Sequence, residues 1–129
     1  MRRKNTTTEM MMGYMCSALL ELMLEKDYTK ISIGEIAKKA GVDRSSYYRH
    51  FKSKEDIISF FFDMVLKESL DGFTNLSSVD FTLYIHSIYM AFYNYKKEIL
   101  LIYRSNLSSL LLDVLSKRFQ FNEYASNSS

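Results

Sequence analysis

Proline is absent from this sequence, and glycine occurs at only four of its 129 positions. Both residues form the tight turns that an all-β fold needs between its strands, so their scarcity favours long helices. Cysteine is represented by Cys16 alone, which excludes an internal disulfide framework and a zinc module built on several cysteines. We therefore expect an all-α protein of a reducing compartment, with a cytoplasmic location.

Long apolar runs are also missing. The basic residues after Met1 are followed by the polar segment Thr6 to Glu9, which does not suit a secretory signal. The longest stretch without Asp, Glu, Lys or Arg, Phe81 to Tyr95, has 15 residues, whereas a membrane-spanning helix needs about 20 apolar ones. No membrane role is indicated.

Groups that would carry out catalysis are scarce as well. The chain has two histidines, His50 and His86, and no glycine-rich loop that would hold a phosphate. Cys16 lies among methionines at helical spacing, without a histidine or second cysteine nearby, which is typical of a hydrophobic core and not of a metal site. The sequence predicts neither an enzyme nor a bound cofactor or metal.

What the sequence does contain is ample material for a core. Hydrophobic residues make up 47% of the chain and aromatic residues 15%, enough for one domain or two small helical subdomains. The net charge is only +2, but Lys and Arg outnumber Asp and Glu from Met1 to Asp56 and not from Ile57 onward. This imbalance alone is weak support for a polyanionic partner, because most surface charges are simply solvated.

The segment from Ser32 to Lys54 predicts two short helices joined by a tight turn. Ser32 is a good N-cap with Glu35 three residues later, a spacing at which each residue can cap the other's backbone N–H. Gly41 would end this helix in the left-handed conformation, and Asp43 would cap the next one at once. So short a turn places two helices at a steep angle, as in a helix-turn-helix.

Longer helices are predicted on both sides of this segment. One begins at Thr7 or Thr8 and runs to about Lys26, and another begins at Ser53 and ends near Asp71 or Gly72. The remaining predicted elements are a turn over Gly72 to Val79, a helix from Asp80 to Tyr95, a bend over Lys96 to Glu98, and helices over Ile99 to Tyr103 and Leu107 to Phe121. We expect a helix-turn-helix domain at residues 1–52 and a connecting helix with a helical body at residues 53–129.

One run of residues is more specific than these patterns: Ile36-Ala37-x-x-Ala40-Gly41-Val42-x-x-x-x-Tyr47-Tyr48-x-His50-Phe51-x-x-Lys54-Glu55-Asp56. It resembles the DNA-binding domain of TetR-family transcriptional regulators, and the resemblance extends from about Met10 to Val65. It implies an all-α, TetR-like fold. A three-helix helix-turn-helix head would be joined by a connecting helix to a C-terminal body that binds small molecules and forms a homodimer.

The C-terminal body departs from the family pattern. Family members generally continue through further helices that form a dimer interface, whereas this chain stops after its seventh predicted helix. We expect either a shortened form or a fragment, or a body whose final helices form the dimer. Through Asn94 to Lys97 and Ala91 to Leu112 it is most similar to short regulators related to dihydroxyacetone-kinase activators. The resemblance here is one of helix pattern only.

The resemblance also implies roles for the outward-facing side chains of the helix-turn-helix. Base contacts are expected from Arg44, Ser45, Ser46 and Tyr48. Phosphate contacts are expected from Ser32, Tyr48, Arg49, His50 and Lys54. Chemistry independently supports Arg44, whose guanidinium can form two hydrogen bonds with guanine. Each residue also has a plainer explanation as a solvated charge, a surface histidine or a helix cap.

Gly34 differs from the family pattern, because some members have a base-reading side chain at that position. Readout is therefore expected to rest more on the second helix of the motif. For the body, an apolar ligand pocket would draw on aromatic and methionine side chains. The candidates are Phe61, Met64, His86, Tyr89, Met90, Phe92 and Tyr103, and a plain helical core explains any one of them more simply.

The leading hypothesis is a transcriptional regulator, more specifically a repressor. It would bind a palindromic operator in double-stranded DNA as a homodimer and be released by a small-molecule effector. The alternative is an interaction adaptor or coactivator that keeps the helix-turn-helix scaffold and works through its C-terminal body.

Overall fold

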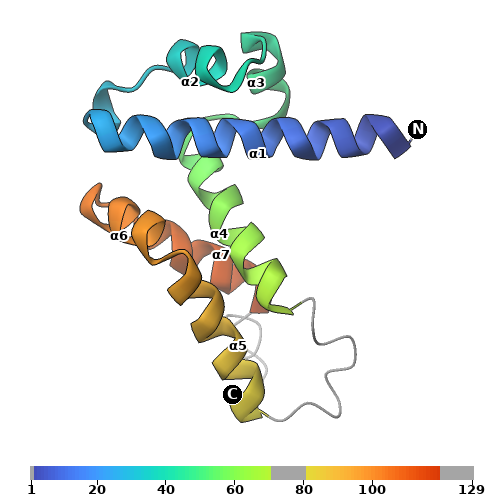
Figure 1. Ribbon diagram of the computed structural model, residues 1–129, viewed down its shortest axis with the longest axis vertical. Coiled ribbons are helices and arrows are strands. Elements are labelled where there is room, and N and C mark those ends of the chain that lie inside the picture. Colours follow the sequence, from blue (N-terminus) through green and yellow to red (C-terminus); the bar gives the residue numbers. More distant parts are fainter. Residues whose placement is uncertain (1, 71–80, 120–129) are drawn as a thin grey trace, which may run out of the picture. The chain divides into compact units, whose positions relative to one another are not determined.

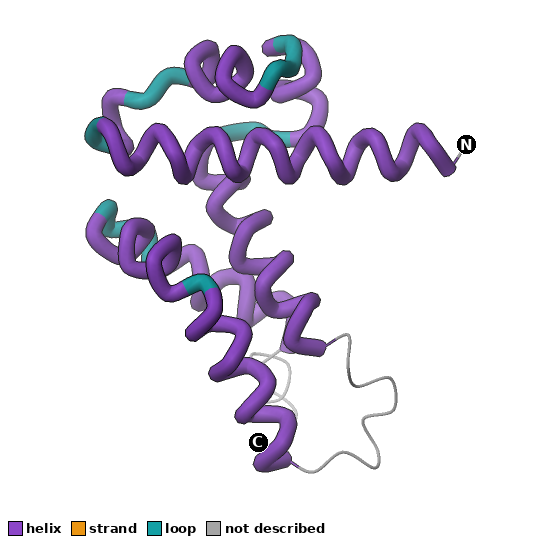
Figure 2. Tube along the Cα trace, in the orientation of Figure 1, coloured by secondary structure: helices purple, strands orange, loops and turns teal. Residues whose placement is uncertain are grey.

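The computed structural model describes residues 2–70 and 81–119. In that part of the chain it contains α-helices and one short 3-10 helix, and no strand. Figure 2 shows the same composition, with short loops between the helices. The predicted all-α class is confirmed. The predicted turn over Gly72 to Val79 and the cap at Asp80 lie outside the described residues.

The chain divides into two compact units, Met1–Phe60 and Phe61–Ser129. The division falls inside the helix α4 (Lys54–Leu70), later than the boundary that we expected after residue 52. α4 therefore contributes its first turns to the N-terminal unit and the rest to the C-terminal unit.

The N-terminal unit combines one long helix with a pair of short ones. Its elements are α1 (Arg2–Glu25), η1 (Tyr28–Lys30), α2 (Ile33–Ala40), α3 (Arg44–His50) and the start of α4. Figure 1 shows α2 and α3 on one side of α1. α1 begins at Arg2 and not at the predicted caps Thr7 or Thr8, because no glycine or proline before Gly13 interrupts the helix.

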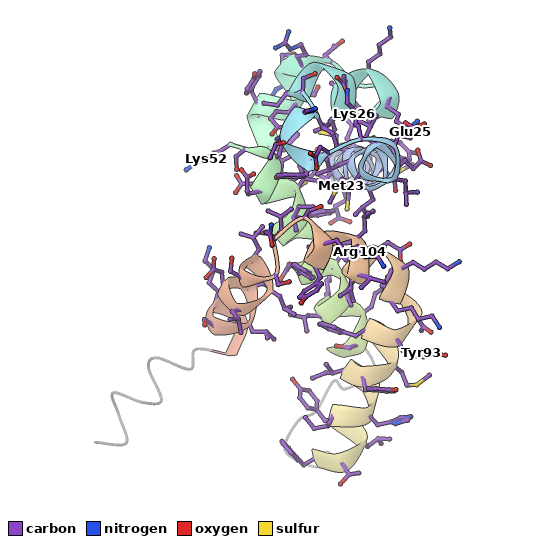
Figure 3. All side chains as sticks on the ribbon, turned by 90° about the vertical axis from the view of Figure 1, so that its left-hand side faces the viewer. Met23, Glu25, Lys26, Lys52, Tyr93 and Arg104 are labelled. Carbon is purple, nitrogen blue, oxygen red and sulfur yellow. The ribbon has the colours of Figure 1, made fainter. Side chains whose placement is uncertain are left out.

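Both ends of α2 follow local sequence rules. The Ser32 hydroxyl oxygen accepts a hydrogen bond from the Glu35 N–H at 3.1 Å, which confirms the predicted cap. The reciprocal bond from Glu35 is not formed, because both of its carboxylate oxygens accept hydrogen bonds from Lys26 Nζ at 2.9 Å. Lys26 lies just past the end of α1 (Figure 3). Gly41 ends α2 at φ 74°, the left-handed conformation that glycine adopts without strain.

The start of α3 differs from the expectation in one detail. Asp43 occupies the N-cap position, but its side chain makes no capping hydrogen bond. Its backbone carbonyl accepts hydrogen bonds from the N–H groups of Ser46 and Tyr47, at 3.0 and 3.2 Å. The turn between α2 and α3 is therefore closed by backbone bonds and by Gly41, not by the aspartate side chain.

Buried apolar side chains in the N-terminal unit come from every one of its helices. They are Met15, Cys16, Ala18, Leu19, Leu22, Met23, Tyr28, Ile31, Ile36, Ala37, Tyr47, Phe51, Ile57 and Ile58. Burial raises the pKa of the Cys16 thiol to about 12, so the thiol stays protonated and takes part in packing only.

The C-terminal unit is more open. Its further helices are α5 (Phe81–Asn94), α6 (Lys96–Arg104) and α7 (Ser109–Phe119), and the break before α6 falls at Tyr95 and not over Lys96 to Glu98. The Tyr95 ring packs edge-on against Phe61 with centroids 5.6 Å apart, and its hydroxyl donates to the Glu68 carboxylate at 2.9 Å. These contacts join the end of α5 to α4. No single described helix is long and apolar enough to cross a membrane, although the bent pair Lys96–Arg104 and Ser109–Lys117 has the length and composition together, with a bend of 117°.

The hydroxyl of Tyr47 is a buried polar group in the N-terminal core. The Tyr47 side chain is fully buried, and its hydroxyl has no hydrogen-bond partner among the described residues. Its ring lies 5.9 Å from that of Phe51. Burial first, and then the charges of Asp56 and Glu55, raise the pKa of Tyr47 to about 12. An unpartnered buried hydroxyl lowers stability, because it has lost its hydrogen bonds to water.

We expect Tyr47→Phe to raise the free energy of unfolding by about 1 kcal/mol at neutral pH, because it removes this hydroxyl and keeps the ring. Because the pKa of Tyr47 is higher in the folded state, ionisation of its hydroxyl favours the unfolded chain. Stability that is present below pH 10 is therefore lost as pH rises toward 12. The variant should therefore lose less stability over that range. Urea unfolding at pH 7 and pH 11 measures both effects, with the exposed Tyr48→Phe as control. A less stable Tyr47→Phe at pH 7 would contradict this.

Candidate nucleic-acid interface

The helix α3 has one buried side and one exposed side. Tyr47 is fully buried, and Phe51, just past the end of the helix, is 3% exposed. Arg44, Tyr48 and Arg49 are exposed on the other side. The sequence of α3 contains no Asp or Glu, so its exposed side presents cations and hydroxyl groups without a carboxylate. Such a surface suits a partner rich in negative charge and hydrogen-bond acceptors.

The four predicted base-contact residues lie together on this helix. Arg44, Ser45 and Tyr48 are exposed, and Ser46 is half-buried. Tyr48 leaves 56% of its surface exposed while its ring packs edge-on against Tyr47 at 5.2 Å. The Tyr48 ring thus packs against a buried residue while more than half of the Tyr48 surface stays exposed.

The residues predicted to contact phosphate are more dispersed. Ser32 is exposed at the N-terminus of α2, Arg49 is exposed on α3, and His50 is half-buried at the end of α3. The Ser32 oxygen accepts the capping bond from Glu35, and its O–H remains free to donate to a phosphate oxygen. The positive end of the α2 dipole lies at the same place.

Lys54 has a different environment from the one that we expected. Its ammonium donates hydrogen bonds to the backbone carbonyls of Tyr28 at 2.8 Å and Ile31 at 2.9 Å. It also lies 4.4 Å from the centroid of the Tyr28 ring. A lysine ammonium has three N–H donors, so these contacts use most of its capacity to form hydrogen bonds. In this structure Lys54 holds the linker between α1 and α2.

The neighbouring residue Glu55 strengthens the same junction. The Tyr28 hydroxyl donates a hydrogen bond to Glu55 Oε2 at 2.6 Å. Burial first, and then this bond and the charge of Glu55, raise the pKa of Tyr28, so its hydroxyl stays protonated and donating. We call Lys54, Glu55, Tyr28 and Ile31 the α4–linker clamp. It ties the start of α4 to the linker before α2, with α2 and α3 between these two points of the chain.

Lys52 is a basic residue that the sequence patterns did not single out. It is exposed in the short connection between α3 and α4, and its side chain projects away from the ribbon (Figure 3). Its backbone N–H donates to Asp56 Oδ2 at 2.8 Å, which fixes the connection and leaves the ammonium outside. Its position directly after Phe51, where the chain leaves α3, is the sequence signal that could have identified it.

Comparison with known proteins agrees with this geometry. Residues 16–59 match the family model described as bacterial regulatory proteins, tetR family. The N-terminal part of this chain is therefore similar in sequence to the TetR family over these residues. The match spans the second half of α1, the complete helix-turn-helix and the start of α4, which are the elements that carry the exposed α3 surface and the α4–linker clamp.

Curated relatives point the same way over short segments of the chain. It is 35% identical over 54 residues to the HTH-type transcriptional regulator EthR of Mycolicibacterium smegmatis, covering 42% of this chain and 25% of that protein. It is 48% identical over 40 residues to the HTH-type transcriptional regulator AcrR of Shigella flexneri, covering 31% and 19%. The matched segments thus span a quarter or less of these relatives. No solved structure matches the chain.

The C-terminal unit contains an open apolar groove of about 410 Å³. Its lining comes from the end of α5, from α6 and from the connection to α7: Tyr89, Phe92, Tyr93, Lys96, Ile99, Leu100, Tyr103 and Ser108. Three of the predicted pocket residues, Tyr89, Phe92 and Tyr103, line it. Phe61 is buried and Met64 half-buried on α4, and His86 and Met90 are exposed on α5, so these four do not contribute to this groove.

We expected His86 in a pocket or in the core. In the structure it is exposed and does not line this groove. Lys96 is the one charged residue of the groove lining, and its ammonium lies 4.3 Å from the centroid of the Tyr93 ring. Figure 3 shows Tyr93 projecting from α5. Among the described residues, no group of three or more His, Cys, Asp or Glu side chains is arranged to hold a metal ion.

We expect Lys54→Met to lower the free energy of unfolding by about 2 kcal/mol, because it removes two charge-assisted hydrogen bonds and leaves their carbonyls without donors. Methionine keeps most of the apolar stem, so little packing is lost. Lys52→Met is the matched control, and its exposed side chain should change stability by less than about 0.5 kcal/mol. Urea unfolding of both variants measures the difference, and equal stabilities would contradict the clamp.

Proposed function

We propose that this chain is a transcriptional regulator that binds an operator in double-stranded DNA through the exposed side of α3. The observation that carries the proposal is the composition of that side, which presents Arg44, Ser45, Tyr48 and Arg49 and no carboxylate. A helix of this kind fits the major groove, where side chains near its N-terminus meet base edges.

The roles of individual residues follow from their position. Arg44 is the first residue of α3, so it is our principal base-reading residue, with Ser45, Ser46 and Tyr48 beside it. Ser32, Arg49, His50 and Tyr48 would contact phosphates, and Lys52 joins them because its ammonium is exposed. We assign Lys54 chiefly to the α4–linker clamp, since its hydrogen bonds are used within the fold.

We further propose that the regulator acts as a homodimeric repressor on a near-palindromic operator. The C-terminal unit supports a dimer, because its helices expose large apolar side chains: Phe81, Leu83, Ile85, Tyr89, Met90, Tyr93, Leu100, Tyr103 and Leu112. Exposed apolar side chains in such number are typical of a surface that another molecule covers.

The groove at Tyr89, Phe92 and Tyr103 is our candidate for an effector site. An effector bound there should raise the thermal midpoint and weaken duplex binding.

Selection from a pool of random duplexes, followed by a salt series on the selected site, tests the proposal. We expect a site with two related half-sites, and log affinity falling with log salt by about 0.9 for each phosphate neutralised. Arg44→Ala should cost about 1 to 3 kcal/mol, mainly at one base position in each half-site. Arg104→Ala is the control, because it removes one positive charge from an exposed position in the C-terminal unit. It should leave binding unchanged.

Two results would contradict the proposal. One is the absence of any enriched sequence, and the other is an affinity that does not depend on salt. Either result, combined with capture of a protein partner through the C-terminal unit, would favour the alternative of an interaction adaptor. A single half-site would instead show that the chain reads DNA as a monomer.

A further inference from the structure

Gly34 is a glycine that its own backbone does not require. It lies in the first turn of α2, where glycine makes a helix less stable than alanine would. Among the described glycines only Gly41 has a positive φ, so the conformation at position 34 would accept any L-residue. The reason for a glycine here must lie in the space around it.

That space is shared with Arg44. A Cβ atom at position 34 would lie 4.0 Å from Arg44 Cζ and 3.8 Å from Ser32 Oγ, and apart from its chain neighbours and the α2 backbone it would meet no other atom within 4 Å. The Arg44 side chain therefore reaches back from the first residue of α3 across the first turn of α2. By contrast, a Cβ atom on the helical Gly13 would meet nothing within 4 Å.

No ion pair holds the guanidinium there. Arg44 has no carboxylate partner among the described residues, and the carboxylate of Glu35, also in the first turn of α2, is bonded to Lys26. The N-terminal end of α2 carries positive dipole charge, which does not attract a cation. The guanidinium lies beside α2, where Gly34 presents no side chain, and its N–H donors remain available to an acceptor from outside.

We propose that Gly34 is a positioning residue that sets the base preference of Arg44. Without a side chain at position 34, the guanidinium has room to lie over the first turn of α2 and to approach a base edge in that orientation. A larger side chain would fill this space and turn the guanidinium away. The inference rests on the proposed function, because it concerns how the same α3 surface reads DNA.

Gly34→Leu and Gly34→Ala test the inference on the full chain. Leucine extends into the space beside Arg44 Cζ, whereas an alanine Cβ at 4.0 Å makes an ordinary contact. Both residues favour a helix over glycine, so both variants should raise the thermal midpoint by about 2 to 5 °C. Gly34→Leu should nevertheless reduce base discrimination about tenfold or more at the position that Arg44 reads, and Gly34→Ala much less. Gly13→Leu is the matched control and should leave the base preference unchanged.

A double-mutant comparison shows whether Gly34 acts through Arg44. In the Arg44→Ala background, Gly34→Leu should have no further effect on the base preference, because the side chain that it displaces is gone. The inference is overturned if Gly34→Leu keeps the wild-type preference, or if it changes the preference equally with and without Arg44. If the wild-type chain selects no sequence at all, the proposed function fails first, and that result is distinct from either of these.

Discussion

The ammonium of Lys54 links parts of the N-terminal unit that are far apart in the sequence. It joins the start of α4 to two backbone carbonyls of the linker before α2, and Glu55 binds the Tyr28 hydroxyl beside it. These bonds connect parts of the chain 23 to 27 residues apart. They close the loop of chain that contains α2 and α3, and so they fix the frame from which α3 is presented.

Within that frame, the two sides of α3 have separate tasks. Tyr47 and Phe51 anchor the helix in the core, where the Tyr47 hydroxyl has no hydrogen-bond partner in the described part of the chain. The opposite side carries arginine, serine and tyrosine and no carboxylate. Gly41 allows the sharp turn that brings α3 against α2, and Gly34 leaves the space beside Arg44 open. The proposed reading surface thus depends as much on two absent side chains as on those that are present.

How far the sequence predicts this structure depends on the range of each interaction. The cap at Ser32 and the end of α2 at Gly41 involve neighbours a few residues away, and both were predicted correctly. For Glu35 we predicted a capping bond and for Lys54 a phosphate contact, whereas the structure shows other hydrogen bonds. Their partners are Lys26, Tyr28 and Ile31, which lie farther away in the sequence and which no local pattern indicates. Three of the predicted pocket residues line the groove of the C-terminal unit, and the ligand pocket itself stays a prediction. Apolar residues at helical spacing are compatible with burial or exposure, and only the packing of α5 and α6 decides between the two.

The central claim is that the exposed side of α3, held by the α4–linker clamp, is the surface that meets DNA. Titrating the isotope-labelled chain with its selected duplex, and following backbone and side-chain resonances by NMR, tests it most directly. We expect the largest changes at Arg44, Tyr48 and Arg49 and at the N–H groups of the first turn of α2, with little change at the buried Tyr28. Changes concentrated on α5, α6 and α7, with α3 unaffected, would contradict the claim.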